Sequence, residues 1–404
     1  MIGADGLPGR PGSRRAFRAL AALASVALLS GLVSACSTPA ANPSPAGDGG
    51  SGAPVPLASA FAGPSAAWVA LAMGHVDDPR NTFWQLFSIS NATGGWELAT
   101  PPGVASNGGI VGSVSPSGSV AAGFAPALGL RFSPLAQSDD GGATWVPGVL
   151  PGGLAPVPDS LAISSAHRYA ALIGSGAGGE VLASSGDLSI WKALALTRSL
   201  AADRPLAGCG IQALSAVAVT PAGVPVVGAA CARGGRAGIF TERNGGWQWI
   251  GPSLPASVPG PTQVIRLTAT PDGATALVRA GVGPSSRLFG ARSTDGLATW
   301  SVSPPVPGTG RALVSTGVTT AGALIAVTQL GPSRSAAVLD GGGGAWLQLA
   351  PLPAGTVAVA ALPGGSSYDA LIVRQSTLDV DALGESGWRH VQSVDVPIQY
   401  GSSG

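Results

Sequence analysis

The stretch Ser138-Asp139-Asp140-Gly141-Gly142-Ala143-Thr144-Trp145 decides the fold, because it recurs in altered form along the chain. A glycine-rich or Ser/Asp-containing turn followed by a tryptophan occurs seven times, and successive tryptophans are 49, 46, 56, 53, 46 and 42 residues apart. A roughly regular spacing of this size is typical of repeat proteins, in particular of rings of four-stranded sheets. The tryptophans are Trp96, Trp145, Trp191, Trp247, Trp300, Trp346 and Trp388.

The segments between these turns are short β-rich runs that are broken by Pro/Gly pairs. Residues 114–118, 219–223 and 269–273 each place such a pair between two apolar runs, which predicts a hairpin. No helical period is visible after residue 36. The sequence therefore predicts an all-β domain over residues 57–398, a seven-bladed β-propeller of four-stranded antiparallel blades, followed by a disordered tail at residues 399–404.

The pattern Ser-x-Asp-x-Gly-x-Thr-Trp resembles the Asp-box, or BNR repeat, of the sialidase-like propeller superfamily. In those families the motif lies on the rim, away from the central site, so the resemblance implies a structural role. The Asp and Ser side chains are expected to form hydrogen bonds within the hairpin between the third and fourth strands, and the Trp to cover the core of the blade. The residues that carry the pattern are Ser138, Asp140, Gly142, Thr144 and Trp145; Ser185, Asp187 and Trp191; and Ser293, Asp295, Thr299 and Trp300.

The N-terminal segment has the features of a lipoprotein signal peptide, which we predict at residues 1–35. Arginines precede an uncharged apolar run at residues 19–33, which is shorter than the roughly twenty residues of a membrane span. The run ends in Val33-Ser34-Ala35-Cys36, which resembles the lipobox of bacterial lipoproteins. We therefore expect Cys36 to be lipidated, and the Pro/Ser/Gly-rich residues that follow it to form a flexible linker, the two together spanning residues 36–56.

This prediction places the protein at the cell membrane, lipid-anchored and facing outside the cytoplasm. The alternative is a simple secretory signal with an unmodified cysteine. The pair Arg14-Arg15 leaves both the general secretory route and twin-arginine export open.

Net charge argues against nucleic acid as a partner. The chain has 21 basic and 20 acidic residues, and 17 against 19 once residues 1–35 are excluded, because that segment holds four arginines and one aspartate. Neither total gives the excess of positive charge that nucleic-acid binding requires. We expect a monomer.

Beyond Cys36 the chain has two cysteines, Cys209 and Cys231, which flank a predicted hairpin whose turn at residues 220–223 is nearly midway between them. Positions equidistant from a hairpin turn face each other within the reach of a disulfide. In an oxidising compartment we expect that bond, the alternative being two buried thiols. The three histidines are far apart in the sequence, and we expect no metal and no cofactor.

An enzyme is the second hypothesis. Resemblance to sialidases would imply an Arg-Ile-Pro motif, which does not occur here, and the expected inner strands at residues 161–165, 214–219, 267–270, 313–318 and 357–361 contain no acid or histidine. A glycosidase of the usual kind needs two carboxylates across the scissile bond. An atypical or degenerate glycoside hydrolase would have to take them from loops, where the candidates are Asp77, Asp78, Asp159, Glu180 and Asp203.

The first hypothesis is a non-catalytic binding or scaffold protein for a protein or an anionic envelope glycan. Propellers similar to photosystem assembly factors are the precedent for that role by resemblance alone. Arginines recur in the expected loops, where they could bind anionic groups in a bidentate manner, although polar loops also carry solvated charge without a function. The residues of the predicted ligand-binding face are Arg80, Arg131, Arg233, Arg236, Arg287 and Arg334, with Arg374, Arg198, Arg204 and Arg311 in neighbouring loops.

Overall fold

The computed structural model divides the chain into two units, Met1–Ser44 and Pro45–Gly404, and all the residues described below belong to the second. The predicted signal peptide, Cys36, the linker and the tail at residues 399–404 lie outside the described residues. The described residues are 58–74, 82–101, 104, 109–124, 134–149, 158–174, 178–186, 188, 190–255, 260–308, 310–341 and 344–396.

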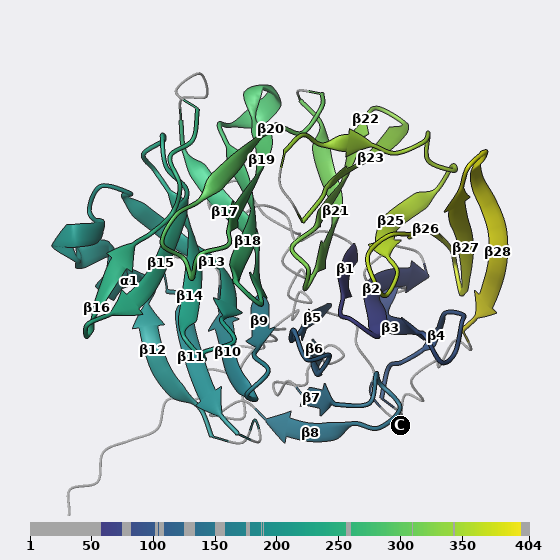
Figure 1. Ribbon diagram of the computed structural model, residues 1–404, viewed down its shortest axis with the longest axis horizontal. Coiled ribbons are helices and arrows are strands. Elements are labelled where there is room, and N and C mark those ends of the chain that lie inside the picture. Colours follow the sequence, from purple (N-terminus) through teal and green to yellow (C-terminus); the bar gives the residue numbers. More distant parts are fainter. Residues whose placement is uncertain are drawn as a thin grey trace, which may run out of the picture. The chain divides into compact units, whose positions relative to one another are not determined.

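Twenty-eight strands in the described part of the chain form seven antiparallel four-stranded blades, each made from one continuous segment. This confirms the predicted fold class. Figure 1 shows the blades arranged in chain order around a common centre.

Blade 1 contains β1 (Ala58–Ala62), β2 (Ala66–Gly74), β3 (Thr82–Ser90) and β4 (Glu97–Leu98). Blade 2 contains β5 (Ile110–Val114), β6 (Val120–Phe124), β7 (Pro134–Ser138) and β8 (Val146–Val149). Blade 3 contains β9 (Ser160–Ile163), β10 (Arg168–Ile173), β11 (Glu180–Ser185) and β12 (Lys192–Leu196). Blade 4 contains β13 (Ile211–Val219), β14 (Pro225–Cys231), β15 (Gly238–Arg243) and β16 (Gly246–Trp249). Blade 5 contains β17 (Thr262–Thr270), β18 (Gly273–Ala280), β19 (Arg287–Ser293) and β20 (Ser301–Pro305). Blade 6 contains β21 (Ala312–Thr319), β22 (Leu324–Leu330), β23 (Ser333–Leu339) and β24 (Leu347–Gln348). Blade 7 contains β25 (Thr356–Ala361), β26 (Tyr368–Arg374), β27 (Thr377–Gly384) and β28 (Gly387–Asp395).

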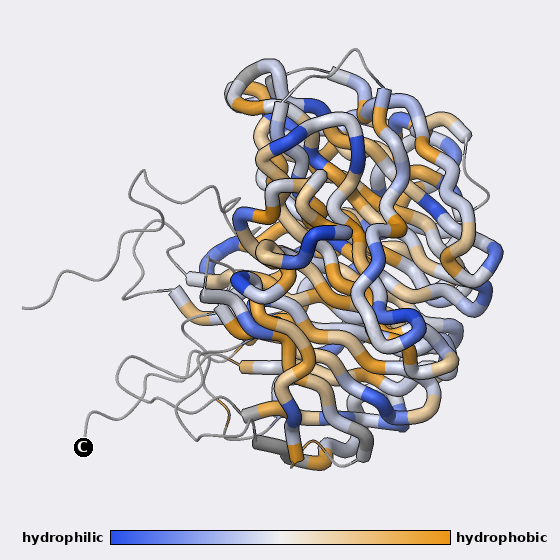
Figure 2. The backbone as a smooth tube through the Cα atoms, turned by 90° about the vertical axis from the view of Figure 1, so that its left-hand side faces the viewer, coloured by the Kyte–Doolittle hydropathy of each residue, from blue (hydrophilic) through white to orange (hydrophobic). Residues whose placement is uncertain are grey.

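The burial of each strand follows from its place in the blade. The second strand is buried on both faces, as in β2 and β6, whereas the fourth strand β16 alternates between exposed and half-buried residues. The hydrophobic clusters consequently lie between neighbouring blades, since each cluster takes residues from at least two of them. Figure 2 shows hydrophobic segments along the strands and hydrophilic ones at the turns.

The antiparallel order gives each blade two unlike ends. The turns between the first and second and between the third and fourth strands lie at one end, which we call the turn face. The loops between the second and third strands and the connections between blades lie at the other end, which we call the loop face.

The connection from blade 3 to blade 4 contains helices, although no helical period is visible in the sequence after residue 36. It contains the α-helix α1 (Thr197–Ala202) and the 3-10 helix η2 (Arg204–Leu206), whose Leu200 and Leu206 are buried. A further 3-10 helix, η3 (Gly283–Ser285), lies between β18 and β19. Helices this short span less than two turns, so no period is visible in the sequence. None of the helices in the described residues is long and apolar enough to cross a membrane.

The described residues that line the centre come from blades 1 to 6, and none of them comes from blade 7. The first strand of blade 1, β1, pairs in parallel with the first strand of blade 6, β21, over residues 58–62 and 315–319. Small residues permit this close pairing, for example Ala60 opposite Gly317. The first strand of blade 7, β25, packs behind this pair, where its Val359 joins Ala58 and Ala60 in one cluster.

The ring closes between blades 7 and 1 through side-chain hydrogen bonds and a backbone bond, while the described strands of the two blades do not pair with each other. The side-chain amide of Gln392 on β28 accepts a hydrogen bond from the backbone N–H of Trp96 (2.8 Å) and donates one to its carbonyl (2.8 Å). The Trp96 indole N–H donates to Asp369 Oδ2 on β26 at 2.8 Å, and both residues are buried. On the loop face, the Gly74 N–H donates to the Gln375 carbonyl at 2.8 Å.

Two further repeat tryptophans also reach the preceding blade. The indole N–H of Trp346 in blade 6 donates to Ser303 Oγ and to the Pro304 carbonyl in blade 5, each at 3.0 Å. That of Trp388 in blade 7 donates to the Ala350 carbonyl after β24 at 3.2 Å. The tryptophans of these blades thus link neighbouring blades as well as covering their own.

Candidate ligand-binding cavity

The inner strands of blades 1 to 6 enclose an axial cavity of about 120 Å³. Its wall is apolar in part, with Phe61 and Trp84 from blade 1 and Ile265 from blade 5. The rest of the wall carries short hydroxyl side chains, which can bind polar groups of a ligand. These hydroxyls belong to Ser59, Ser113, Ser160, Ser215, Thr268 and Thr316.

Among the described residues that line this cavity, Arg266 on β17 is the one basic residue. Its side chain is half-buried in this wall, and the partial loss of water lowers the pKa of Arg266 to about 10, so the guanidinium stays protonated at neutral pH. It forms no hydrogen bond or ion pair with the described residues. Asp159, which precedes β9, is the one acid that the described part of the chain contributes to the same lining, and it is exposed. A cation held in a narrow, partly apolar space is a candidate site for an anionic group.

A β-bulge places Arg266. Val264 pairs with Val278 and Arg266 with Leu277, so Ile265 is an extra residue in β17. The first strands of blades 4, 6 and 7 have corresponding bulges, and in blade 4 the extra Ser215 stands as far before Pro221 as Ile265 does before Pro271. The Ser215 hydroxyl donates to the Val264 carbonyl at 2.6 Å, which joins the two bulges across the blades.

The predicted arginine face is only partly available to a ligand. Arg80 and Arg131 lie outside the described residues. Arg236 donates to the Gly251 carbonyl at 2.9 Å and stacks on Trp249, with Cζ 4.4 Å from the ring centroid. Arg334 donates to Gln329 Oε1 at 3.2 Å and to the Thr356 carbonyl of blade 7. The side chains of Arg236 and Arg334 are thus bound within the protein, whereas Arg233 is exposed and Arg287 is half-buried. Arg287 and Arg334 lie on β19 and β23, and not in the loops predicted for them.

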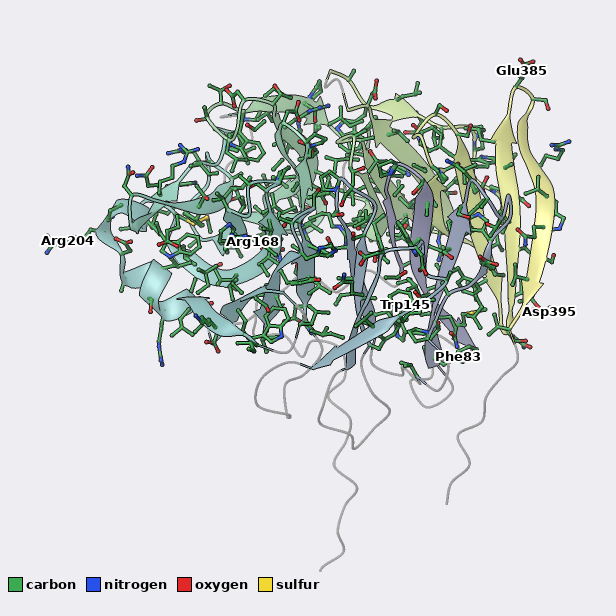
Figure 3. All side chains as sticks on the ribbon, turned by 60° about the horizontal axis from the view of Figure 1, so that its bottom comes forward. Phe83, Trp145, Arg168, Arg204, Glu385 and Asp395 are labelled. Carbon is green, nitrogen blue, oxygen red and sulfur yellow. A yellow bond between two sulfur atoms is a disulfide. The ribbon has the colours of Figure 1, made fainter. Side chains whose placement is uncertain are left out.

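The other predicted loop arginines differ in their surroundings, and Arg374 is the last residue of β26. Arg374 forms an exposed ion pair with Asp379 at 2.6 Å. Arg198 and Arg204 are exposed residues on α1 and η2, and Figure 3 shows Arg204 at the outer edge of the domain. Arg311, in contrast, lines a cavity between blades 5 and 6.

The carboxylate of Asp140 forms its hydrogen bonds within its own hairpin, whereas the neighbouring Asp139 reaches His167 of blade 3 at 3.1 Å. The Ser138 hydroxyl donates to Asp140 Oδ1 (2.7 Å), which also accepts from the Thr144 N–H (2.9 Å), while the Thr144 hydroxyl donates to Oδ2 (2.6 Å). These donors, the Thr144 hydroxyl foremost, lower the pKa of Asp140 to about 2. Gly142 has a φ of 96°, and its N–H donates to Ser138 Oγ at 2.8 Å.

The second close copy repeats this arrangement. Ser293 donates to Asp295 Oδ1 at 2.9 Å, and the Thr299 hydroxyl donates to Oδ2 at 2.5 Å, which lowers the pKa of Asp295 to about 2. Trp300 follows directly after this turn and is half-buried. In the third copy Asp187 and the Ser185 side chain lie outside the described residues, and the Trp191 indole donates to the Leu188 carbonyl at 2.8 Å. All three turns lie on the turn face, away from the loop-face arginines.

The disulfide between Cys209 and Cys231 is confirmed, with the two Cα atoms 5.0 Å apart. Both residues are fully buried. The bond fastens the α1–η2 connection to the end of β14, next to the loop face. In the described residues no group of His, Cys, Asp and Glu side chains is arranged to hold a metal ion.

Two arginines that line the cavities were not predicted from the sequence as site residues, namely Arg266 on β17 and Arg279 on β18. The expected inner strand began at Leu267, whereas β17 begins at Thr262. The available signal was the run at residues 262–270, in which an arginine stands among strand-forming residues.

Comparison with solved structures agrees with this architecture. The periplasmic gluconolactonase of Pseudomonas aeruginosa aligns with a TM-score of 0.52 and 13% identity, over 81% of this chain and 96% of that one. A protein from Lactobacillus plantarum aligns with a TM-score of 0.50 and 11% identity, over 82% and 97%. YCF48 from Cyanidioschyzon merolae aligns with a TM-score of 0.43 and 14% identity, over 81% of this chain and 92% of that one.

Identities this low establish the fold and nothing further, and the fold is that of a seven-bladed β-propeller. No protein-family model matches the sequence. No curated protein matches it either.

Proposed function

We propose that this protein is a membrane-anchored, extracytoplasmic propeller that binds an anionic envelope glycan through its axial cavity. The observation that supports this proposal is Arg266, a cation inside the cavity with no ion pair to the described residues. A partly buried guanidinium is stabilised when a carboxylate accepts its N–H groups in a bidentate manner. The cavity is large enough for one such group with its nearest atoms, so it would hold a single acidic residue of a longer chain.

The test is binding of polygalacturonate, an acidic polymer, with neutral dextran as the reference. The purified propeller is expected to bind polygalacturonate and not dextran, and added salt should weaken binding. Arg266→Gln should reduce the affinity about 10- to 100-fold, because a hydrogen bond to a charged group contributes about 1.5–3 kcal/mol. Titration calorimetry measures both affinities.

The control is Arg389→Gln, which removes the same charge from an exposed position on β28. It should leave the affinity unchanged. If both variants weaken binding equally, the effect comes from the overall charge of the protein, and Arg266 is not part of the binding site.

One observation favours the alternative of an atypical glycoside hydrolase, since Asp159 lines the same cavity. Hydrolysis of the usual kind needs a second carboxylate, and the candidates Asp77 and Asp78 lie outside the described residues. If new reducing ends appear in the same polygalacturonate samples and Asp159→Asn abolishes them, the protein hydrolyses the polymer. The hydrolase alternative would then replace the binding proposal.

Membrane attachment is the second part of the proposal, and it rests on Cys36 and the small residues before it. Two or more acyl chains hold a protein stably at a membrane. Cys36→Ser is expected to move the protein from the membrane fraction to the soluble extracytoplasmic fraction while the propeller stays folded. A variant that stays in the membrane fraction would show that lipid on Cys36 is not the anchor.

A further inference from the structure

A second cavity, of about 300 Å³, opens between blades 5 and 6 on the loop face. Its blade 5 wall includes Arg279 and Leu288, which are paired across β18 and β19. Its blade 6 wall includes Leu313 and Thr328, which are paired across β21 and β22. Two cross-strand pairs, one from each of two neighbouring blades, therefore face each other across the cavity.

Arg279 brings a positive charge to this space on a half-buried side chain. Its Nε is buried and finds no hydrogen-bond acceptor among the described residues. Burial also lowers the pKa of Arg279, as expected for a cation that has lost water without gaining a partner. Such a group is costly unless something outside the protein completes its hydrogen bonds.

Arg311 brings a second charge from the opposite wall. Its Nη1 donates to Ser335 Oγ at 2.8 Å, which fixes the side chain on blade 6, but its Nε is likewise buried without an acceptor in the described residues. The side chain crosses Gly308, where an added Cβ would lie 2.3 Å from Nε. Gly308 also has a φ of 91°, so glycine is required there both by the backbone and by the arginine.

No acidic side chain occurs among the described residues that line this cavity. Two guanidiniums without a counter-ion match a group with two negative charges. A carboxylate has one charge and is satisfied by a single guanidinium, whereas a phosphate monoester carries nearly two charges at neutral pH and three acceptor oxygens. Hydroxyls of Ser286 and Thr328 and the apolar Leu288 and Val306 supply the remaining lining that a sugar ring would need.

We propose that the cavity between blades 5 and 6 is a binding site for a phosphate monoester, with Arg279 and Arg311 holding the phosphoryl group. The site is separate from Arg266 and does not depend on the axial cavity being the glycan site. Its volume exceeds that of a phosphate ion, so a small phosphorylated sugar would fill it better than free phosphate.

The test is titration calorimetry on the folded propeller with glucose 6-phosphate, inorganic phosphate, dimethyl phosphate and glucose. Glucose 6-phosphate and inorganic phosphate are expected to bind, and dimethyl phosphate, which has one charge, at least tenfold more weakly than either. Glucose should not bind. Affinity for phosphate should rise between pH 5 and pH 7.5, because its second pKa is about 6. Tighter binding of glucose 6-phosphate identifies a phosphorylated sugar as the ligand class, and equal binding identifies free phosphate.

Arg279→Gln and Arg311→Gln should each weaken binding at least tenfold, while Arg389→Gln should leave it unchanged. Both variants keep a polar side chain of similar length, and thermal unfolding checks that each is folded. No binding of either phosphate compound, or the same affinity in both arginine variants, would overturn the proposal. Retention of phosphate binding in Arg266→Gln would show that the two sites are independent, whereas its loss would overturn that independence.

Discussion

Replacement of Trp96 by alanine is expected to lower the free energy of unfolding of the propeller by about 3–5 kcal/mol, the range for removing a large aromatic side chain from a core. Trp96 is 2% exposed, and its indole makes the buried hydrogen bond to Asp369 that joins the first blade to the last. Its loss leaves a cavity at the closure and a buried carboxylate without its donor. The shift of the urea unfolding midpoint, with the slope from the same curve, measures the change.

The matched comparison for this prediction is Trp145→Ala. Trp145 occupies the corresponding turn of blade 2 but is only half-buried, and it contacts Phe124 of its own blade edge-on with centroids 6.4 Å apart. Trp145→Ala should lower the free energy of unfolding clearly less than Trp96→Ala does. Equal losses would mean that the closure between blades 1 and 7 has no special part in stability.

Asp369 gives the closure a dependence on pH. Burial raises the pKa of Asp369 above its ordinary value of 3.8, and the hydrogen bond from Trp96 only partly opposes this. A raised pKa in the folded state means that the native protein binds the proton more tightly, so stability is highest below the ordinary pKa and falls as pH rises through the raised one. Asp369→Asn keeps an oxygen acceptor without the charge, so its stability relative to the wild type should increase over that same rise in pH.

Removal of the disulfide is the second large effect. The paired substitution Cys209→Ser and Cys231→Ser is expected to lower the free energy of unfolding by about 3 kcal/mol, the chain-entropy value for a bond that closes a loop of this length. The bond also holds the α1–η2 connection against β14, so fraying should start there. Urea unfolding with and without reductant measures the loss.

Reductant supplies the internal control for this prediction. It should lower the stability of the wild type to that of the double variant and leave the variant itself unchanged. A wild type that is as stable in reductant as without it would show that packing of the two buried residues, and not the bond, stabilises blade 4.

The outcome for the arginines shows how far a sequence can predict a site of this kind. The sequence predicted loop positions for both Arg236 and Arg334, but Arg334 lies on β23. Their partners, Gly251 with Trp249 for Arg236 and Thr356 for Arg334, depend on how distant segments pack together. Arg279 and Arg311 are 32 residues apart in sequence and belong to two different blades. Only the packing of one blade against the next brings them to a common cavity.

The seven hairpins, their tryptophans and the pairing of Cys209 with Cys231 were determined by the sequence itself, because each depends on chemistry within one turn or one hairpin. The tertiary structure alone decided the rest. The bulge at Ile265 shifts the alternation of β17 and so brings Arg266 to the axis, and the parallel pairing of β1 with β21 keeps blade 7 away from it. Both depend on contacts between residues far apart in the chain, which no local pattern of residues records.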